Sequence, residues 1–499
     1  MKTIFILTDT LCRRYLSLYG NDWTITPNIV RLAKRSTVFD QHWCGSAPCI
    51  PARHDLLTGR LNFLERNWGG AEPYDEILPT ILRQRKGTYS HLATDHMFYA
   101  EKGGENYLAA FNSWELVRGQ EHDPLISTVK DVPIPAHHGV MPQQYVKNRT
   151  VFKSEEDFPT PKTFGKAVDW LKQNRGADNY FLWVEGFDPH EPFDQSDNYR
   201  ELYPDDYTGP EYIWPAYAPC SDTPEQLAHV KKRYAATISM MDAWLGKLLD
   251  ELDAQNAWDD SLVIFTTDHG YMFGEHGFMA KNYMPAYNEV FHIPLLIHTP
   301  GQAVSSRCAA LTQNIDLFPT ILDYFGVDPE TCRNRLHGKS LRPVLDGRQS
   351  KVREALIYGY YGLSVNVTDG KYSYFRAARN EDNRPLNLYT ASPSTLRQNF
   401  GVDSVADFTR IDQGRHLSWT SYPVFKYPAD CIRYDNQSQN FAVRNAYNRE
   451  SLLFDIGADY AQAQPVQDPA LEKAYSDLLS RLMKEHDSPT EQFERLGLD

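Results

Sequence analysis

The sequence predicts an α/β protein built on a large mixed, mostly parallel central sheet flanked by helices, with a smaller C-terminal α+β subdomain. Short apolar runs alternate with longer helical patterns through most of the chain, which is typical of a parallel sheet covered on both faces. Two of these runs end on carboxylates, at Asp9 and at Asp268. Near residue 355 the pattern changes to closely spaced strands rich in Tyr and Val.

The elements of the first part follow from the apolar runs and from helix-capping residues. Thr26-Pro27 offers an N-cap and a proline at the first helical position, and Thr223-Pro224 opens a long helix in the same way. Pro51 is expected at the first position of a further helix, which carries Arg53. The expected strands are 3–8, 36–42, 90–94, 180–185, 261–267 and 294–298, and the other expected helices are 26–35, 223–252 and 316–325.

The second part of the chain is expected to begin after residue 355. Asp369-Gly370 marks a tight turn between two of its strands, and Asp468-Pro469 opens a final amphipathic helix over 470–485. We therefore predict two domains, 1–355 and 356–499, which pack closely because no flexible linker separates them. Residues 115–160 are loop-like, and a loop of that length in a compact domain usually covers an active site.

Composition excludes several classes of partner. The 499 residues carry a formal net charge of -14, which argues against nucleic acid and requires a local positive cluster for any anionic substrate. No apolar run approaches the ~20 residues of a membrane span, and the N-terminus shows no secretory signal. The seven cysteines form no C-x-x-C pair, which fits a reducing compartment. We expect no membrane contact and a cytoplasmic location.

Asp9 and Asp268-His269 are the candidate metal ligands. Each follows a predicted buried strand, at the sheet edge where open α/β sheets gather their ligands. Two carboxylates and an imidazole suit one divalent cation; calcium, magnesium and manganese are candidates, and the imidazole argues somewhat against calcium. Taken singly, such residues also occur in ordinary turns at strand ends.

Cys49-Ile50-Pro51-Ala52-Arg53 is the candidate nucleophile motif. A helix that starts beside Cys49 would point free amides and a positive dipole end at an anion there. Arg53, one turn on, is expected to fork onto the nucleophile or onto an anionic oxygen of the substrate. The alternative is an unmodified buried cysteine beside a structural arginine.

Together these motifs resemble the type I, formylglycine-dependent sulfatases of the alkaline-phosphatase-like superfamily, a group with related phosphonate monoester hydrolases. Leu56–Gly59 also matches the family's pattern after the nucleophile. The resemblance implies that a formylglycine-generating enzyme oxidises Cys49 to an aldehyde, which acts as its hydrate on a small anionic ester. It spans most of the first 345 residues and resumes at Leu452–Asp455, similar to the family's C-terminal strand, whereas residues 376–450 match no pattern.

The resemblance also implies the roles of individual residues. Arg53 and Lys281 would stabilise charge on the sulfuryl oxygens, and His190 in Asp-Pro-His-Glu-Pro would protonate the leaving alcohol. The implied metal ligands are Asp9, Cys49, Asp268 and His269, and the implied substrate-binding residues are Asn67, His96 and Asn282.

Thr10 departs from the family pattern, in which the first strand usually ends in two consecutive aspartates. The loss of one carboxylate lowers the negative charge of the site, although Thr10 could still add a ligand. A similar departure occurs among the phosphonate monoester hydrolases. The leading hypothesis is a sulfate-ester hydrolase; the alternatives are a phosphonate monoester or phosphodiester hydrolase and, more remotely, an inactive binding protein. The alcohol, the metal and a homo-oligomeric state stay open.

Overall fold

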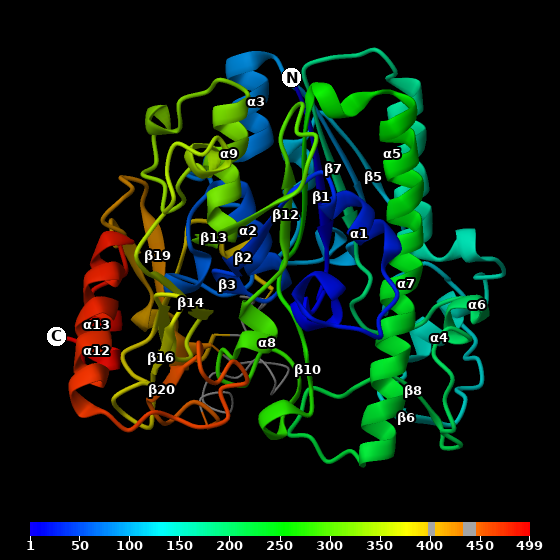
Figure 1. The fold of residues 1–499 in the computed structure, drawn as a ribbon. Coiled ribbons are helices and arrows are strands. Elements are labelled where there is room, and N and C mark those ends of the chain that lie inside the picture. Colours follow the sequence, from blue (N-terminus) through cyan, green and yellow to red (C-terminus); the bar gives the residue numbers. More distant parts are fainter. Residues whose placement is uncertain (398–404, 433–445) are drawn as a thin grey trace.

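The computed structural model describes residues 1–397, 405–432 and 446–499 and has a sheet of eight strands at its centre (Figure 1). The strand order is β13-β2-β12-β9-β1-β7-β4-β5. β12 runs antiparallel to β9 and β2, whereas the other neighbouring pairs are parallel, which confirms the mixed, mostly parallel sheet. The strands are β1 Lys2–Thr8, β2 Thr37–Trp43, β4 Tyr89–Thr94, β5 Ser113–Leu116, β7 Tyr180–Gly186, β9 Ser261–Thr267, β12 Leu295–His298 and β13 Ser306–Gln313.

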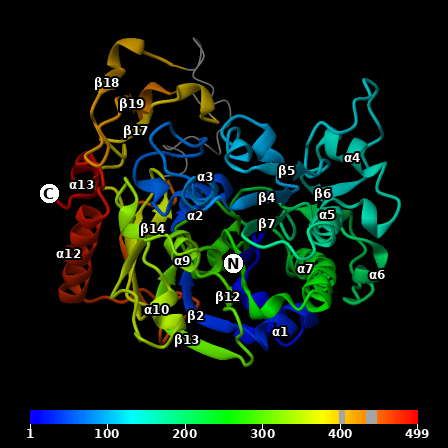
Figure 2. The same ribbon diagram turned by 90° about the horizontal axis from the view of Figure 1, so that it is seen from above.

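Two hydrophobic cores cover the two faces of this sheet. Successive residues of a strand point to opposite faces. Ile4 and Ile6 therefore join one core, under α1, α5 and α7, while Phe5 and Leu7 join the other, under α2, α3 and α9 (Figure 2). The helices are α1 Pro27–Ala33, α5 Pro159–Gln173, α7 Pro224–Ala254, α2 Cys49–Thr58, α3 Leu78–Lys86 and α9 Leu317–Tyr324.

The C-terminal part forms a second sheet, of order β20-β16-β15-β14-β3, with α12 and α13 beside it (Figure 1). β3 comes from the first part of the chain and ends just before Pro48, so this sheet also supports the segment that leads to Cys49. The predicted division near residue 355 stays a proposal. The elements are β3 Ser46–Ala47, β14 Leu356–Tyr360, β15 Val365–Thr368, β16 Tyr372–Arg376, β20 Leu452–Asp455, α12 Pro469–Glu485 and α13 Glu491–Leu496.

Short elements complete the structure. The region 115–160, which was expected to be loop-like, contains β6 and α4 as well as loops. This short strand and helix were not predicted because the apolar residues of the region are too widely spaced to indicate them. The remaining elements are β6 His137–Gly139, α4 Gln143–Arg149, α6 Asp197–Arg200, β8 Glu211–Trp214, β10 Met272–Phe273, β11 Met279–Ala280, α8 Asn288–Phe291, α10 Arg342–Leu345, β17 Asn387–Thr390, β18 Asp412–Gly414 and β19 Val424–Pro428.

Several helix boundaries follow the capping residues. Thr223 and Asp468 accept hydrogen bonds from main-chain amides of α7 and α12, as their positions predicted. One boundary is corrected: α2 begins at Cys49, so Pro51 is its third residue and not its first. The first four amides of a helix have no intrahelical acceptor, so proline is tolerated at that third position.

Two further predictions concern the whole chain. All seven cysteines lie within the described residues and are free thiols, as the absence of a disulfide pattern predicted. Among the helices that the structure describes, none is long and apolar enough to cross a bilayer.

Candidate active site

Asp9 and Asp268 meet at one edge of the central sheet. β1 lies between β7 and β9, and Thr8 is in register with both Gly186 and Thr267. The residues that follow these three positions therefore leave the ends of β1, β7 and β9 side by side. The Thr10 amide donates to Asp268 Oδ1 at 2.9 Å, which fixes the two carboxylates relative to each other. The two carboxylates therefore lie together at the ends of their strands, as expected for an open α/β sheet.

Cys49 reaches the same point as the first residue of α2, a helix whose ten residues are all buried. Asp55 anchors the approach to this helix: its carboxylate accepts hydrogen bonds from the amide and hydroxyl of Ser46 and from the amide of Asn62. The chain before and after α2 is thus tied to one side chain within it. Cys49 Sγ lies 3.4 Å from His269 Nε2 and 3.9 Å from Asp9 Oδ1.

Four of these groups can hold one cation. One ligand atom each from Asp9, Cys49, Asp268 and His269 lies within 4.8 Å of all the others. His269 Nδ1 is 3.0 Å from the Gly270 carbonyl oxygen, which can only accept, so Nδ1 carries the proton and Nε2 presents its lone pair to Cys49 and Asp268. Nε2 lies 3.3 Å from Asp268 Oδ2, so its lone pair faces that carboxylate oxygen. Facing lone pairs repel unless a cation lies between them, so the residues fit a divalent metal ion.

The structure corrects the expected contacts of Arg53. Its guanidinium is fully buried and forms ion pairs with Asp9, Asp268 and Glu185, at 2.9, 2.7 and 2.7 Å. It also donates to the Cys49 carbonyl oxygen. These contacts use its donors within the protein, and Arg53 is not among the residues that line the cavity described below. Its guanidinium therefore contacts the candidate metal ligands Asp9 and Asp268 and is not directed into the cavity.

The pKa values of Asp9 and Asp268 are shifted in opposite directions. Burial would raise the pKa of Asp9, but Arg53 and Lys281 outweigh it and hold that pKa well below 3.8. Burial, with the negative charge of Asp9, raises the pKa of Asp268 to about 6. Burial and Asp9 likewise raise the pKa of the Cys49 thiol well above 9.0. An unmodified Cys49 is thus a neutral thiol and a poor nucleophile.

Lys281 is the positive group that the sequence placed at the reaction centre. It follows β11 and is 1% exposed. Its Nζ lies 2.6 Å from Thr10 Oγ1 and 3.7 Å from both Cys49 Sγ and Asp9 Oδ1. Burial would lower the pKa of Lys281, but the carboxylates around it, Asp9 foremost, raise it above 10.5, so the side chain is an ammonium.

A cavity of about 480 Å³ opens onto Cys49 and Lys281. His190, Asn67 and Asn282 line it, so three of the predicted substrate-side residues reach the same space. His96 does not line it: its ring is fully buried, with Nε2 3.7 Å from Asp9 Oδ2. The segment predicted as a cover contributes Glu121, His122, Val140 and Pro142 to the lining.

Comparison with known proteins assigns the family. A family model described as Sulfatase matches residues 2–327, well over half of the chain. The chain belongs to the sulfatase family. Its sequence is 25% identical over 410 residues to choline-sulfatase from Rhizobium meliloti, covering 75% of this chain and 78% of that one. It is 24% identical over 438 residues to N-acetylglucosamine-6-O-sulfatase from Bacteroides thetaiotaomicron, covering 72% and 74%.

The sulfatase-family fold extends over nearly the whole chain. The phosphonate monoester hydrolase of Agrobacterium radiobacter superposes with a TM-score of 0.68, covering 97% of this chain and 96% of that one at 20% sequence identity. This likeness confirms the predicted α/β architecture, including a C-terminal part that most sequence motifs do not reach.

Several residues of this sulfatase-family site were not predicted. Glu185, the partner of Arg53, is a carboxylate inside the apolar run Tyr-Phe-Leu-Trp-Val-Glu-Gly of β7, and a charge in a buried strand was the signal available. Glu121 and Glu191 had no such signal, because each lies in a loop. Arg397 joins the cavity from the region that matched no family pattern, with its guanidinium over the rings of Trp68 and Phe98.

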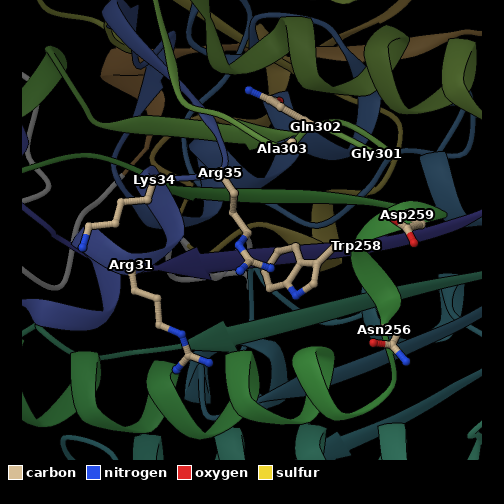
Figure 3. A pocket seen from close by; sticks show the side chains of 9 residues that line it. All are labelled: Arg31, Lys34, Arg35, Asn256, Trp258, Asp259, Gly301, Gln302 and Ala303. Carbon is tan, nitrogen blue, oxygen red and sulfur yellow. The ribbon is translucent and has the colours of Figure 1, made fainter.

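A second hollow, of about 520 Å³, lies between α1 and the turn after α7 (Figure 3). Both of its arginines are already paired: Arg31 contacts Asp250 and Asp253, and Arg35 lies over Trp258 and contacts Asp253. It contains none of the predicted site residues, so the chemistry of this sulfatase-family chain is assigned to the cavity at Cys49.

Proposed function

We propose that this protein hydrolyses sulfate esters of small alcohols, with a formylglycine formed from Cys49 as nucleophile and one divalent metal ion. The observation that carries the proposal is the position of Cys49: it opens α2, lies within 3.9 Å of two candidate metal ligands and faces a cavity that also exposes Lys281. The family model and the two sulfatase relatives support the same reaction.

The protein's own residues divide the work. Asp9, Asp268, His269 and residue 49 would hold the metal, which as a Lewis acid would offset negative charge at the reacting oxygens. A formylglycine hydrate would supply a hydroxyl nucleophile that the neutral thiol of Cys49 cannot. Lys281 binds a sulfuryl oxygen with its ammonium, and Arg53 keeps the carboxylates oriented.

His190 is the proposed proton donor to the leaving alcohol. Its ring lines the cavity, and its Nδ1 donates to the Glu191 carbonyl oxygen at 2.7 Å. That bond fixes the ring and leaves Nε2 to face the substrate. A histidine held by one nitrogen and presented by the other suits general acid catalysis.

The first test is mass spectrometry of the peptide that contains Cys49. Conversion to formylglycine lowers its mass by ~18 Da, from the replacement of CH₂SH by CHO. We expect active preparations to carry this change and to release sulfate from an aryl sulfate. Activity should disappear on chelation and return with a divalent ion. Active enzyme with an unaltered thiol, or activity that survives exhaustive chelation, would contradict the proposal.

A phosphonate monoester hydrolase is the second candidate. Thr10 favours it, since the site has one carboxylate fewer than the usual sulfatase pattern. The Agrobacterium radiobacter protein supports the shared fold alone. Turnover of an aryl sulfate and of the matching aryl phosphonate monoester, measured on one formylglycine-bearing preparation, decides between the two.

A further inference from the structure

Two buried glutamates on the active-site cavity have no part in the proposed hydrolysis. Glu121 and Glu191 line the cavity and are only 5% and 1% exposed. A carboxylate oxygen of each lies 3.3 Å from His190 Nδ1. A buried carboxylate is costly unless hydrogen bonds or a cation offset its charge, so both need partners.

One carboxylate oxygen of Glu191 lacks a hydrogen-bond donor among the described residues. Its Oε1 accepts a hydrogen bond from the Tyr217 hydroxyl, but its Oε2 is buried without a hydrogen-bond partner among the described residues. His190 does not supply one, because its Nδ1 proton is directed to the main-chain oxygen of Glu191. Buried polar atoms are nearly always hydrogen-bonded, so a ligand with an N–H group would complete this site.

The basic groups nearby do not supply the missing hydrogen bond to Glu191 Oε2. His122 lies between two carboxylates, with Nδ1 3.2 Å from Glu121 and Nε2 3.5 Å from Glu101. One imidazolium thus serves Glu101 and Glu121 together. Arg397 is engaged elsewhere on the lining, with its guanidinium 4.3 Å from the Trp68 ring centroid. His190 and Lys281 also lie on this lining, but neither donates a hydrogen bond to Glu191 Oε2 among the described residues.

The geometry favours an organic cation over a second metal ion. Glu121, His190 and Glu191 are close enough to hold a metal. However, His190 Nδ1 carries a proton, so the nitrogen beside the two carboxylates has no lone pair to offer. Trp214 and Tyr217 also line the cavity, and the faces of such rings attract ammonium groups.

We propose that Glu191, together with Glu121, binds an ammonium group on the alcohol portion of the substrate. The preferred substrates would be sulfate esters of primary amino alcohols, with sulfate at Lys281 and the ammonium at Glu191. This binding proposal rests on the proposed function only because residue 49, which would react, lies in the same cavity.

The test separates binding from turnover. A Cys49→Ala variant cannot form the nucleophile, so calorimetry on it measures binding alone. Ethanolamine sulfate and propyl sulfate differ only in a terminal ammonium or methyl group. We expect the ammonium ester to bind about tenfold or more tightly, as for hydrogen bonds to a charged group. Glu191→Gln in the same background should remove that preference and leave propyl sulfate binding unchanged.

Glu201→Gln, an exposed glutamate on the turn after α6, is the matched control and should keep the preference. Equal binding of the two esters, no measurable binding of the ammonium ester, or equal weakening of both by Glu191→Gln would overturn the proposal. So would two divalent ions per chain with one lost in Glu191→Gln, which would assign the glutamates to a metal. Failure of the formylglycine-bearing enzyme to turn over either ester would contradict the proposed function and leave this binding result standing.

Discussion

The ammonium of Lys281 donates a hydrogen bond to the hydroxyl of Thr10, with 2.6 Å between Nζ and Oγ1. Thr10 in turn donates to Asp9 Oδ1, also at 2.6 Å. A neutral hydroxyl therefore links the buried lysine to the carboxylate of a candidate metal ligand. Because Thr10 carries no charge, more of the positive potential of Lys281 is left for an anionic substrate.

Replacing Lys281 by methionine keeps the length of the side chain and removes its charge. We expect kcat/KM for an aryl sulfate to fall about a hundredfold or more, because the ammonium offsets charge that develops on the sulfuryl oxygens. Steady-state kinetics on formylglycine-bearing protein measures the effect. The exposed Lys339→Met is the control and should change little. A Lys281→Met enzyme with unaltered kcat/KM would rule out this role.

Thr10→Asp should strengthen metal binding. Thr10 has φ 65°, a left-handed conformation that suits aspartate better than a β-branched residue, so the substitution fits the backbone. An added carboxylate beside Asp9 should lower the dissociation constant for a divalent ion about tenfold, because affinity rises with ligand charge. Chelator competition gives the constant. Thr10→Asn has a similar shape without the charge, and an equal gain in that variant would refute the electrostatic explanation.

Arg53→Met should destabilise the fold. It removes the guanidinium that three buried carboxylates, on Asp9, Glu185 and Asp268, share. Breaking a buried ion pair from one side costs about 3–5 kcal/mol in the free energy of unfolding. Urea denaturation measures this loss, with the exposed Arg348→Met as control. If Arg53→Met unfolds at the wild-type urea concentration, the guanidinium is not what holds these carboxylates.

Acid should destabilise the protein through His42. Its ring is fully buried, and burial together with Arg353 lowers its pKa from 6.5 to about 3. Between these values the unfolded chain binds a proton that the folded chain does not, so stability is lost as pH falls below 6.5. The slope for this one group approaches ~1.4 kcal/mol per pH unit. Urea denaturation at pH 7 and pH 5 should show a smaller difference in His42→Gln; an identical difference would contradict the assignment.

The sequence by itself determined where the reacting groups enter the site. Asp9 and Asp268 follow buried strands, and Cys49 is followed by a proline two residues on and by an arginine one helical turn on. These are local relationships: a strand end and a helix start depend on neighbouring residues, so periodicity and capping rules reach them. Register then brings Asp9 and Asp268 together, because adjacent parallel strands end at one sheet edge.

The tertiary structure alone decided which groups face one another. Arg53 pairs with Glu185, 132 positions away, and this directs its guanidinium into the protein and away from the cavity. Glu121 and Glu191 meet at His190 from separate loops, and Arg397 reaches the cavity from a region without a recognisable motif. Such contacts depend on how distant segments pack, and local propensity carries no information about them. The reacting groups of the proposed chemistry were therefore visible in the sequence, together with part of the cavity lining, whereas Glu121, Glu191 and Arg397 on that lining were not.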